Sequence, residues 1–109
     1  MELFAEVPPG SKHYAHPIVR THPVTGRKAL YVNRGMTLCV EGMARAESDA
    51  LLLKLFEHAE QTRFQYCHVW KPGDLVMWDN RCTLHARNDF PADQRRMLRR
   101  VTLLGDKPF

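Results

Sequence analysis

Apolar side chains between residues 46 and 61 recur at the spacing of one face of an α-helix. Charged side chains fall largely between them, so the segment predicts one amphipathic helix with a single buried stripe. Its start is poorly marked, because no Ser, Thr, Asp or Asn closely precedes Arg45. The apolar positions are Leu51, Leu52, Leu55, Phe56 and Ala59, and the charged ones are Glu47, Lys54, Glu57 and Glu60.

Two short β-prone runs precede this helix, at residues 18–21 and 29–32. The turn-forming sequence Pro-Val-Thr-Gly at residues 23–26 separates them, which predicts two strands joined by a turn. Residues 1–17 show little periodicity and contain three prolines and a glycine, so they predict a loop or lead-in. The folded portion is therefore expected to span residues 18–109.

Strand-like runs also follow the helix, and turn sequences separate them. With the earlier pair they amount to about six short strands around one helix, without the alternation of strands and helices that a parallel sheet needs. This pattern predicts a mainly β fold with one helix, as part of a jelly roll, also called a double-stranded β-helix. The runs are residues 64–70, 75–78, 82–85 and 96–104, and the turns and loops are residues 71–74, 79–80 and 88–93.

Length and hydropathy limit the chain to one domain outside the membrane. A free-standing fold of 109 residues buries a modest fraction of its surface, so self-association is expected. The longest apolar stretch, residues 50–56, is interrupted by Lys54 and is far shorter than the roughly 20 residues that span a bilayer. The N-terminus lacks a basic region followed by an apolar run, which argues against a secretory signal and favours the cytoplasm.

Cysteine spacing and charge exclude two further classes. Cys39, Cys67 and Cys82 are odd in number and widely spaced, so they predict buried free thiols and neither a disulfide framework nor a structural zinc site. Much of the net charge of +4 comes from one cluster of arginines and not from an extended basic stripe. Nucleic-acid binding is therefore not expected. The cluster consists of Arg95, Arg96, Arg99 and Arg100.

Candidate chemistry concentrates in residues 78–85, Trp-Asp-Asn-Arg-Cys-Thr-Leu-His, with Arg96 and Arg100 eleven and fifteen residues beyond His85. With the segments around it, this region resembles the C-terminal signature of the taurine dioxygenase and 2,4-dichlorophenoxyacetate dioxygenase family. The resemblance runs from about residue 16 to residue 109. The other matching segments are residues 21–23 (Thr-His-Pro), 26–30, 32–35, 71–74 and 99–106.

The resemblance implies an iron(II), 2-oxoglutarate-dependent oxygenase that hydroxylates a small anionic organic substrate. It implies that His85 is an iron ligand, that Arg96 pairs with the far carboxylate of 2-oxoglutarate and that Arg100 holds an anionic group of the substrate. The residue types suit these roles, since neutral imidazole binds Fe(II) and guanidinium binds carboxylates through paired hydrogen bonds. On one strand, Arg96 and Arg100 would share a face roughly 13 Å apart.

Structural roles compete with each of these assignments. His85 could be a solvated or hydrogen-bonded strand-end residue, and the arginine pair could be a charge device on an edge strand or a phosphate-facing patch. Arg95 and Arg99 would point to the opposite face and into solvent. For the aromatic side chains nearby, packing in the core or against the sheet is expected in preference to stacking on a substrate. These aromatic residues are Phe64, Tyr66, Trp70 and Trp78.

The chain departs from the family at the metal site. Family members supply two further ligands from an upstream His-x-Asp or His-x-Glu motif, and this chain has no His-x-Asp. Its one His-x-Glu, at His58 and Glu60, lies on the predicted helix, where residues two apart diverge by about 200° and cannot readily share a metal. One ligand of three predicts incomplete catalysis by the chain alone. The chain would then be a fragment, a truncated descendant or one part of an assembly with its own copies or a complementing chain. The alternative function is a non-catalytic binding or assembly module that retains a half-barrel.

Overall fold

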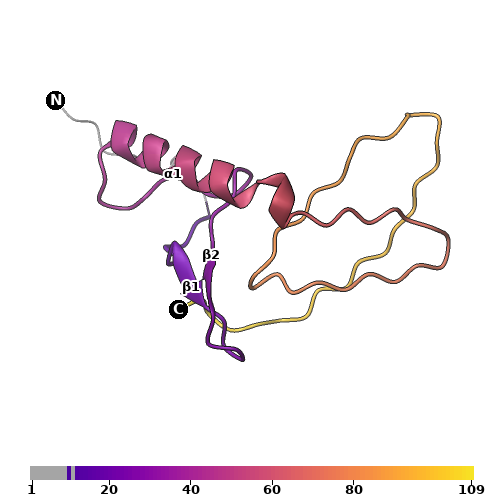
Figure 1. Ribbon diagram of the computed structural model, residues 1–109, viewed down its shortest axis with the longest axis horizontal. Helices are drawn as coiled ribbons and strands as arrows, with labels where there is room; N and C mark the ends of the chain where they lie inside the picture. Colours follow the sequence, from indigo (N-terminus) through magenta and orange to yellow (C-terminus); the bar gives the residue numbers. More distant parts are fainter. Residues whose placement is uncertain (1–9, 11) are drawn as a thin grey trace.

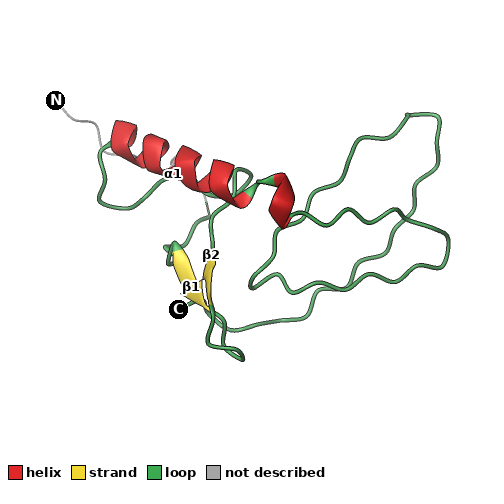
Figure 2. Ribbon diagram, in the orientation of Figure 1, coloured by secondary structure: helices red, strands yellow, loops and turns green. Residues whose placement is uncertain are grey.

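The computed structural model describes residue 10 and residues 12–109, and regular structure is confined to the first part of this range. The elements are β1 (Val19–Thr21), β2 (Lys28–Leu30), α1 (Arg45–Ala59) and the 3-10 turn η1 (Thr62–Phe64) (Figure 1). Residues 65–109 are irregular chain that runs away from α1 and returns to β1 (Figure 2). Most of the predicted lead-in over residues 1–17 lies outside the described residues, and residues 12–16 are without regular structure.

β1 and β2 form the predicted antiparallel hairpin, with Arg20 opposite Ala29. The His22 backbone N–H donates to the Arg27 carbonyl over 2.8 Å and closes the turn. Gly26 has a φ of 70°, a left-handed value that glycine adopts without a steric penalty, so its place at the end of the turn is explained. The Thr21 N–H, on the other edge of β1, donates to the Phe109 carbonyl over 2.6 Å. The C-terminal end of the chain therefore contacts the hairpin.

Helix α1 confirms the predicted amphipathic segment, and its charged positions are all exposed. Leu52, at the centre of the apolar stripe, is only 4% exposed. No side chain caps the first turn, which agrees with the weak start signal. Ser48, which is fully buried, instead accepts the Val40 N–H at its hydroxyl over 2.8 Å and ties α1 to the preceding loop. None of the helices in the described part of the chain is long and apolar enough to cross a membrane.

The four strands predicted after the helix are wrong for the described residues, because the sheet ends with β2. Their turns are confirmed: the Asp74 N–H donates to the Lys71 carbonyl over 3.1 Å, and Gly73 has a φ of 88°. A strand, however, exists only where a neighbouring backbone accepts its ladder of hydrogen bonds. Between residues 65 and 109 the backbone hydrogen bonds of the described chain are those of turns and the single bond to β1, so the extended runs stay unpaired. The predicted helix stands, but the predicted extent of the sheet does not.

The missing sheet also overturns two expectations about packing. Tyr66 is 86% exposed and Trp78 is 37% exposed, so the aromatic side chains after the helix do not form a core. The three thiols are free as predicted, but Cys67 and Cys82 are exposed and not buried. The buried side chains among the described residues all precede residue 60, and they are Arg20, His22, Val32, Ser48 and Leu52. The second half of the chain therefore leaves its apolar side chains largely in solvent.

Candidate active site

His85, the predicted iron ligand, lies on the irregular chain two residues beyond a tight turn. Its ring is exposed and sits beside the Trp78 indole, with 4.7 Å between ring centroids and 43° between planes. No hydrogen bond or ion pair occupies either imidazole nitrogen within the described chain. Both nitrogens are therefore free to bind a metal, and the neighbouring indole limits the positions of the ring.

Arg96 and Arg100, the predicted anion-binding pair, do not share a strand. Arg96 lies over the Phe90 ring, with its guanidinium carbon 5.5 Å from the centroid, and Arg87 contacts the same ring at 5.4 Å. Arg100 is exposed and forms no ion pair with any described residue. The expectation of one common strand face is wrong, because residues 96–104 pair with no neighbouring strand. No hydrogen bond joins His85, Arg96 and Arg100 to one another within the described residues.

The turn before His85 is organised by Asp79. Its Oδ1 accepts the Arg81 backbone N–H over 2.9 Å and the Arg81 Nε–H over 2.8 Å, and its Oδ2 accepts Nη2 of Arg81 over 2.9 Å. Its carbonyl accepts the Thr83 N–H over 3.0 Å and the Thr83 hydroxyl over 2.6 Å. One residue therefore fixes the conformation of residues 79–83, in the manner of an Asx turn.

The charge of Asp79 is held by its partners. The hydrogen bonds from Arg81, and then the one from His22, lower the pKa of the Asp79 carboxyl well below its usual range. The hydrogen bond to Asp79 in turn raises the pKa of the Arg81 guanidinium. Hydrogen bonds to the ionised form of a carboxyl favour that form, so Asp79 is a carboxylate throughout the neutral range.

His22 connects this turn to the hairpin, and its contacts define its protonation. Nδ1 lies 3.1 Å from both the Val24 and Thr25 backbone nitrogens, which donate to it. Nδ1 must then be unprotonated, so the proton is on Nε2, which donates to Oδ2 of Asp79 over 2.9 Å. The ring is buried, at 8% exposed, and joins positions 57 residues apart in the sequence.

A hollow of about 500 Å³ opens beside this pair, and donor atoms of His22, Asp79 and Cys82 lie within 4.8 Å of one another. The hydrogen bonds argue against a metal there. A metal on Nε2 would move the proton to Nδ1, which two backbone N–H groups already face. The hollow is lined by His22, Thr25, Arg27, Lys28, Ala29, Asp79 and Cys82.

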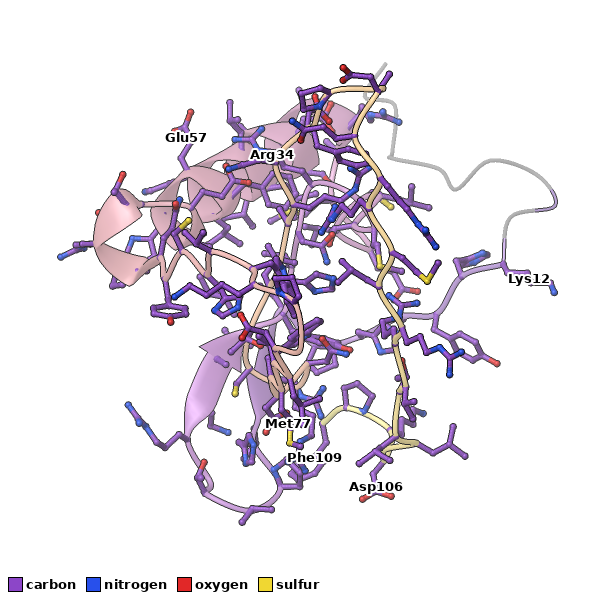
Figure 3. The ribbon with its side chains drawn as sticks, turned by 90° about the vertical axis from the view of Figure 1, so that its right-hand side faces the viewer. Lys12, Arg34, Glu57, Met77, Asp106 and Phe109 are labelled. Carbon is purple, nitrogen blue, oxygen red and sulfur yellow. The ribbon has the colours of Figure 1, made fainter. Side chains whose placement is uncertain are left out.

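An iron site can be assembled only in part from the described residues. His85 offers a free imidazole, but the described chain brings no carboxylate and no second histidine to it. His58 and Glu60 do not form an alternative site, since Glu60 binds Arg34 over 2.8 Å and His58 faces Gln61. Arg34 lies against α1 (Figure 3), with its guanidinium carbon 5.4 Å from the centroid of the Phe56 ring. The described residues thus supply one of the three protein ligands of such an iron centre, His85.

Roles for His22, Asp79 and Arg81 were not predicted from the sequence, although all three residues lie in motifs that carry the family resemblance. Two local signals could have indicated them. An aspartate at the start of Asp-Asn-Arg is typical of an Asx turn, and a histidine before Pro-x-x-Gly can accept N–H groups from that turn. Their pairing across the chain, however, depends on tertiary structure.

Known proteins match most of the chain, including the residues of the candidate site. The family described as taurine catabolism dioxygenase TauD, TfdA family matches residues 6–102. The chain is 49% identical over 89 residues to an alpha-ketoglutarate-dependent 2,4-dichlorophenoxyacetate dioxygenase from Burkholderia sp. (strain RASC), covering 82% of this chain and 30% of the relative. It is 41% identical over 90 residues to an (S)-phenoxypropionate/alpha-ketoglutarate-dioxygenase from Sphingobium herbicidovorans, covering 83% and 31%.

A third relative extends the range of named activities. A pentalenolactone F synthase from Streptomyces arenae is 38% identical over 93 residues, covering 85% of this chain and 31% of the relative. The chain thus spans about 30% of the length of the first of these curated relatives. No solved structure matches it. The matched residues include both the turn that Asp79 organises and His85, and the chain belongs to the TauD, TfdA family of dioxygenases.

Proposed function

We propose that this chain forms the C-terminal part of an Fe(II)- and 2-oxoglutarate-dependent dioxygenase that hydroxylates a small anionic organic substrate. The observation that carries the proposal is the free imidazole of His85, set behind an ordered turn within the family match. Relatives from three different organisms are named for two phenoxy acid dioxygenases and one synthase. This variety supports the reaction class and leaves the substrate unspecified.

Each proposed residue has a separate task. His85 holds one position on the iron through a neutral nitrogen, while Arg96 holds the far carboxylate of 2-oxoglutarate through a bidentate guanidinium contact. Arg100 attracts the anionic group of the substrate and orients it. When bound, the iron supplies oxygen activation, coupled to conversion of 2-oxoglutarate to succinate and carbon dioxide and to hydroxylation of the substrate.

Two more iron ligands are needed, and we propose that they come from another part of the polypeptide or from a complementing chain. The relatives that carry the named activities are about three times as long as the matched region, since it covers 30% of the first. A single protein ligand binds iron weakly and leaves its position undefined. The chain alone is therefore proposed to bind iron without turning over.

The proposal is tested by anaerobic titration of the chain with Fe(II) and 2-oxoglutarate, following visible charge-transfer absorption. The unaltered chain should develop the band, and His85→Ala should lose it, with affinity for Fe(II) falling by at least ~10-fold. His68→Ala is the matched control, because His68 lies in the same irregular segment but pairs with Asp74 over 3.1 Å and has no proposed role in the site.

Either of two outcomes would contradict the proposal. An equal band in the His85→Ala variant would place the iron elsewhere. Absence of any band at saturating Fe(II) and 2-oxoglutarate would favour the alternative, a binding or assembly module without catalytic chemistry. Thermal unfolding of the metal-free variant should stay within about 0.5 kcal/mol of the unaltered chain, since the His85 side chain is exposed and unbonded.

A further inference from the structure

A continuous series of contacts runs from the exposed turn of the hairpin, through the buried His22, to His85. It begins at the two backbone N–H groups of Val24 and Thr25 that donate to Nδ1 of His22. It crosses to the second half of the chain through the 2.9 Å bond from Nε2 of His22 to Asp79. Within the described chain this is the one hydrogen bond between side chains that joins the hairpin to residues 65–109.

Asp79 connects the hairpin, through its hydrogen bond with His22, to the segment that carries His85. Its side chain and carbonyl together bind Arg81 and Thr83, so the turn is fixed to within two residues of the histidine. On the other flank, the Trp78 indole N–H donates to Asn80 over 2.8 Å, and the indole ring packs beside the His85 ring. The ring of His85 is therefore placed from both ends of the same turn.

We propose that His22 is a positioning residue for His85, acting through the hydrogen bond from its Nε2–H to Asp79. The proposal rests on the proposed function, in which His85 is an iron ligand. Residues 65–109 lack strands that would hold His85 in place, so its position depends on the few bonds that reach this segment. A ligand held by such a shell binds metal more tightly than a freely moving one.

A purely structural role is the competing explanation, since His22 also accepts the N–H groups of its own turn. Each role uses a different ring nitrogen: Nδ1 accepts the N–H groups of the turn, and Nε2 donates to Asp79. Substitutions can therefore remove one role and keep the other. Asparagine places its amide oxygen where Nδ1 lies, so His22→Asn keeps the acceptor for Val24 and Thr25 and loses the bond to Asp79. Glutamine places its amide nitrogen near Nε2, so His22→Gln keeps the donor toward Asp79 and loses the acceptor in the turn.

The experiment compares these variants by the imidazole NMR signals of His85 in the complete metal-free chain. Ring currents from Trp78 shift these signals in the unaltered protein, because the rings lie 4.7 Å apart. We expect His22→Asn to lose this shift and His22→Gln to retain it. Anaerobic Fe(II) titration should show affinity weakened on the order of 10-fold in His22→Asn and less than about 3-fold in His22→Gln.

The matched control is His68→Asn, which breaks another histidine–aspartate bond in the irregular segment, at 3.1 Å to Asp74, with no link to Asp79. It should leave the His85 signals unchanged. The proposal is overturned if His22→Asn leaves the His85 shift in place, or if only His22→Gln removes it. It is also overturned if Fe(II) broadens the His22 signals before those of His85, because the metal would then occupy the hollow.

If both His22 variants lose the shift, a double-mutant cycle with Asp79→Asn decides between the roles. Substitutions that act through one bond are not additive, so no further change in Fe(II) affinity in the double variant supports the proposal, whereas additive losses overturn it. The NMR measurement contains no metal, so positioning can fail or succeed independently of the proposed function. That function fails separately if Fe(II) leaves the His85 signals of the unaltered chain unchanged.

Discussion

Three arginines in the second half of the chain differ in what their charge already contacts. Arg81 has its guanidinium committed to Asp79, at 2.8 Å, so its charge is neutralised within the protein. Arg96 lies over an aromatic ring and Arg100 is exposed, and neither forms an ion pair among the described residues. A cation without an internal partner keeps its hydrogen-bonding capacity for a ligand. The second half of the chain therefore contains one structural arginine, Arg81, and two arginines of the charge cluster, Arg96 and Arg100, whose charge is accessible to a ligand.

The accessible guanidinium of Arg96 leads to a prediction about 2-oxoglutarate. Arg96→Leu should weaken binding of the oxoacid by about 2–5 kcal/mol where the far carboxylate is bound away from water, because that charge would lose its partner. Arg95→Leu is the matched control, since it removes the same charge one residue away and should change binding little. Isothermal titration of both variants checks this, and equal losses would remove Arg96 from the site.

Asp79 leads to a prediction about acid stability. Its pKa is lowered on folding by Arg81 and His22, so its contribution to stability is complete above the ordinary aspartate pKa of about 4 and declines as the pH falls below it. Asp79→Asn cannot ionise and should be less stable than the unaltered chain at pH 7. Urea unfolding at several pH values should show this difference shrinking below about pH 4. A difference that stays constant with pH would show that the Asp79 charge does not contribute.

Among the elements, those with local hydrogen bonds were predictable from the sequence. The α1 helix closes its bonds within one segment, and the hairpin closes its own across the turn at Gly26, so periodicity and turn chemistry sufficed. The run at residues 75–78 has the same β-prone composition but needs a partner from elsewhere, and no described segment pairs with it through backbone hydrogen bonds. The hydrogen bond between His22 and Asp79 could not be predicted from the sequence either, because 57 residues separate the two. The motif did place His85 beside an ordered turn.

Helix α1 offers a direct test of which apolar positions stabilise the fold. Leu52 is 4% exposed, while its neighbour Leu53 is 47% exposed. Leu52→Ala should destabilise the chain by about 2 kcal/mol, near the low end for buried leucine, because Val32 is the one other buried apolar side chain among the described residues. Leu53→Ala should change stability by less than about 0.5 kcal/mol and controls for helix propensity. Thermal unfolding of both variants is the measurement, and equal effects would mean that α1 does not bury the predicted face.

At the scale of the molecule, the chain is far more open than a compact domain of its size. Its accessible surface is 10216 Å², whereas a compact monomer of 12.7 kDa is expected to expose about 6,200 Å². Its radius of gyration is 17.0 Å, against about 13 Å expected for 109 residues. Much of the excess is apolar and belongs to the irregular segment: Leu75, Met77, Val101, Leu103 and Leu104 are each at least 86% exposed.

This exposed apolar surface predicts association. Figure 3 shows Met77 and Phe109 on the side of the molecule away from α1, where unpaired backbone offers edges for strand pairing. The excess of about 4,000 Å² falls in the range that obligate interfaces bury, so we expect a homodimer or a larger assembly, or capture of a complementing chain that supplies the missing strands.

Sedimentation at micromolar concentration should give at least twice the monomer mass of 12.7 kDa. Leu103→Asp should reduce that mass, because a charge cannot be buried unpaired at such an interface, whereas Lys107→Asp, close by on the same segment, should not. A monomer that unfolds cooperatively and binds the dye ANS no more than a compact protein would contradict the prediction, since its apolar side chains would then have to be covered by the chain itself.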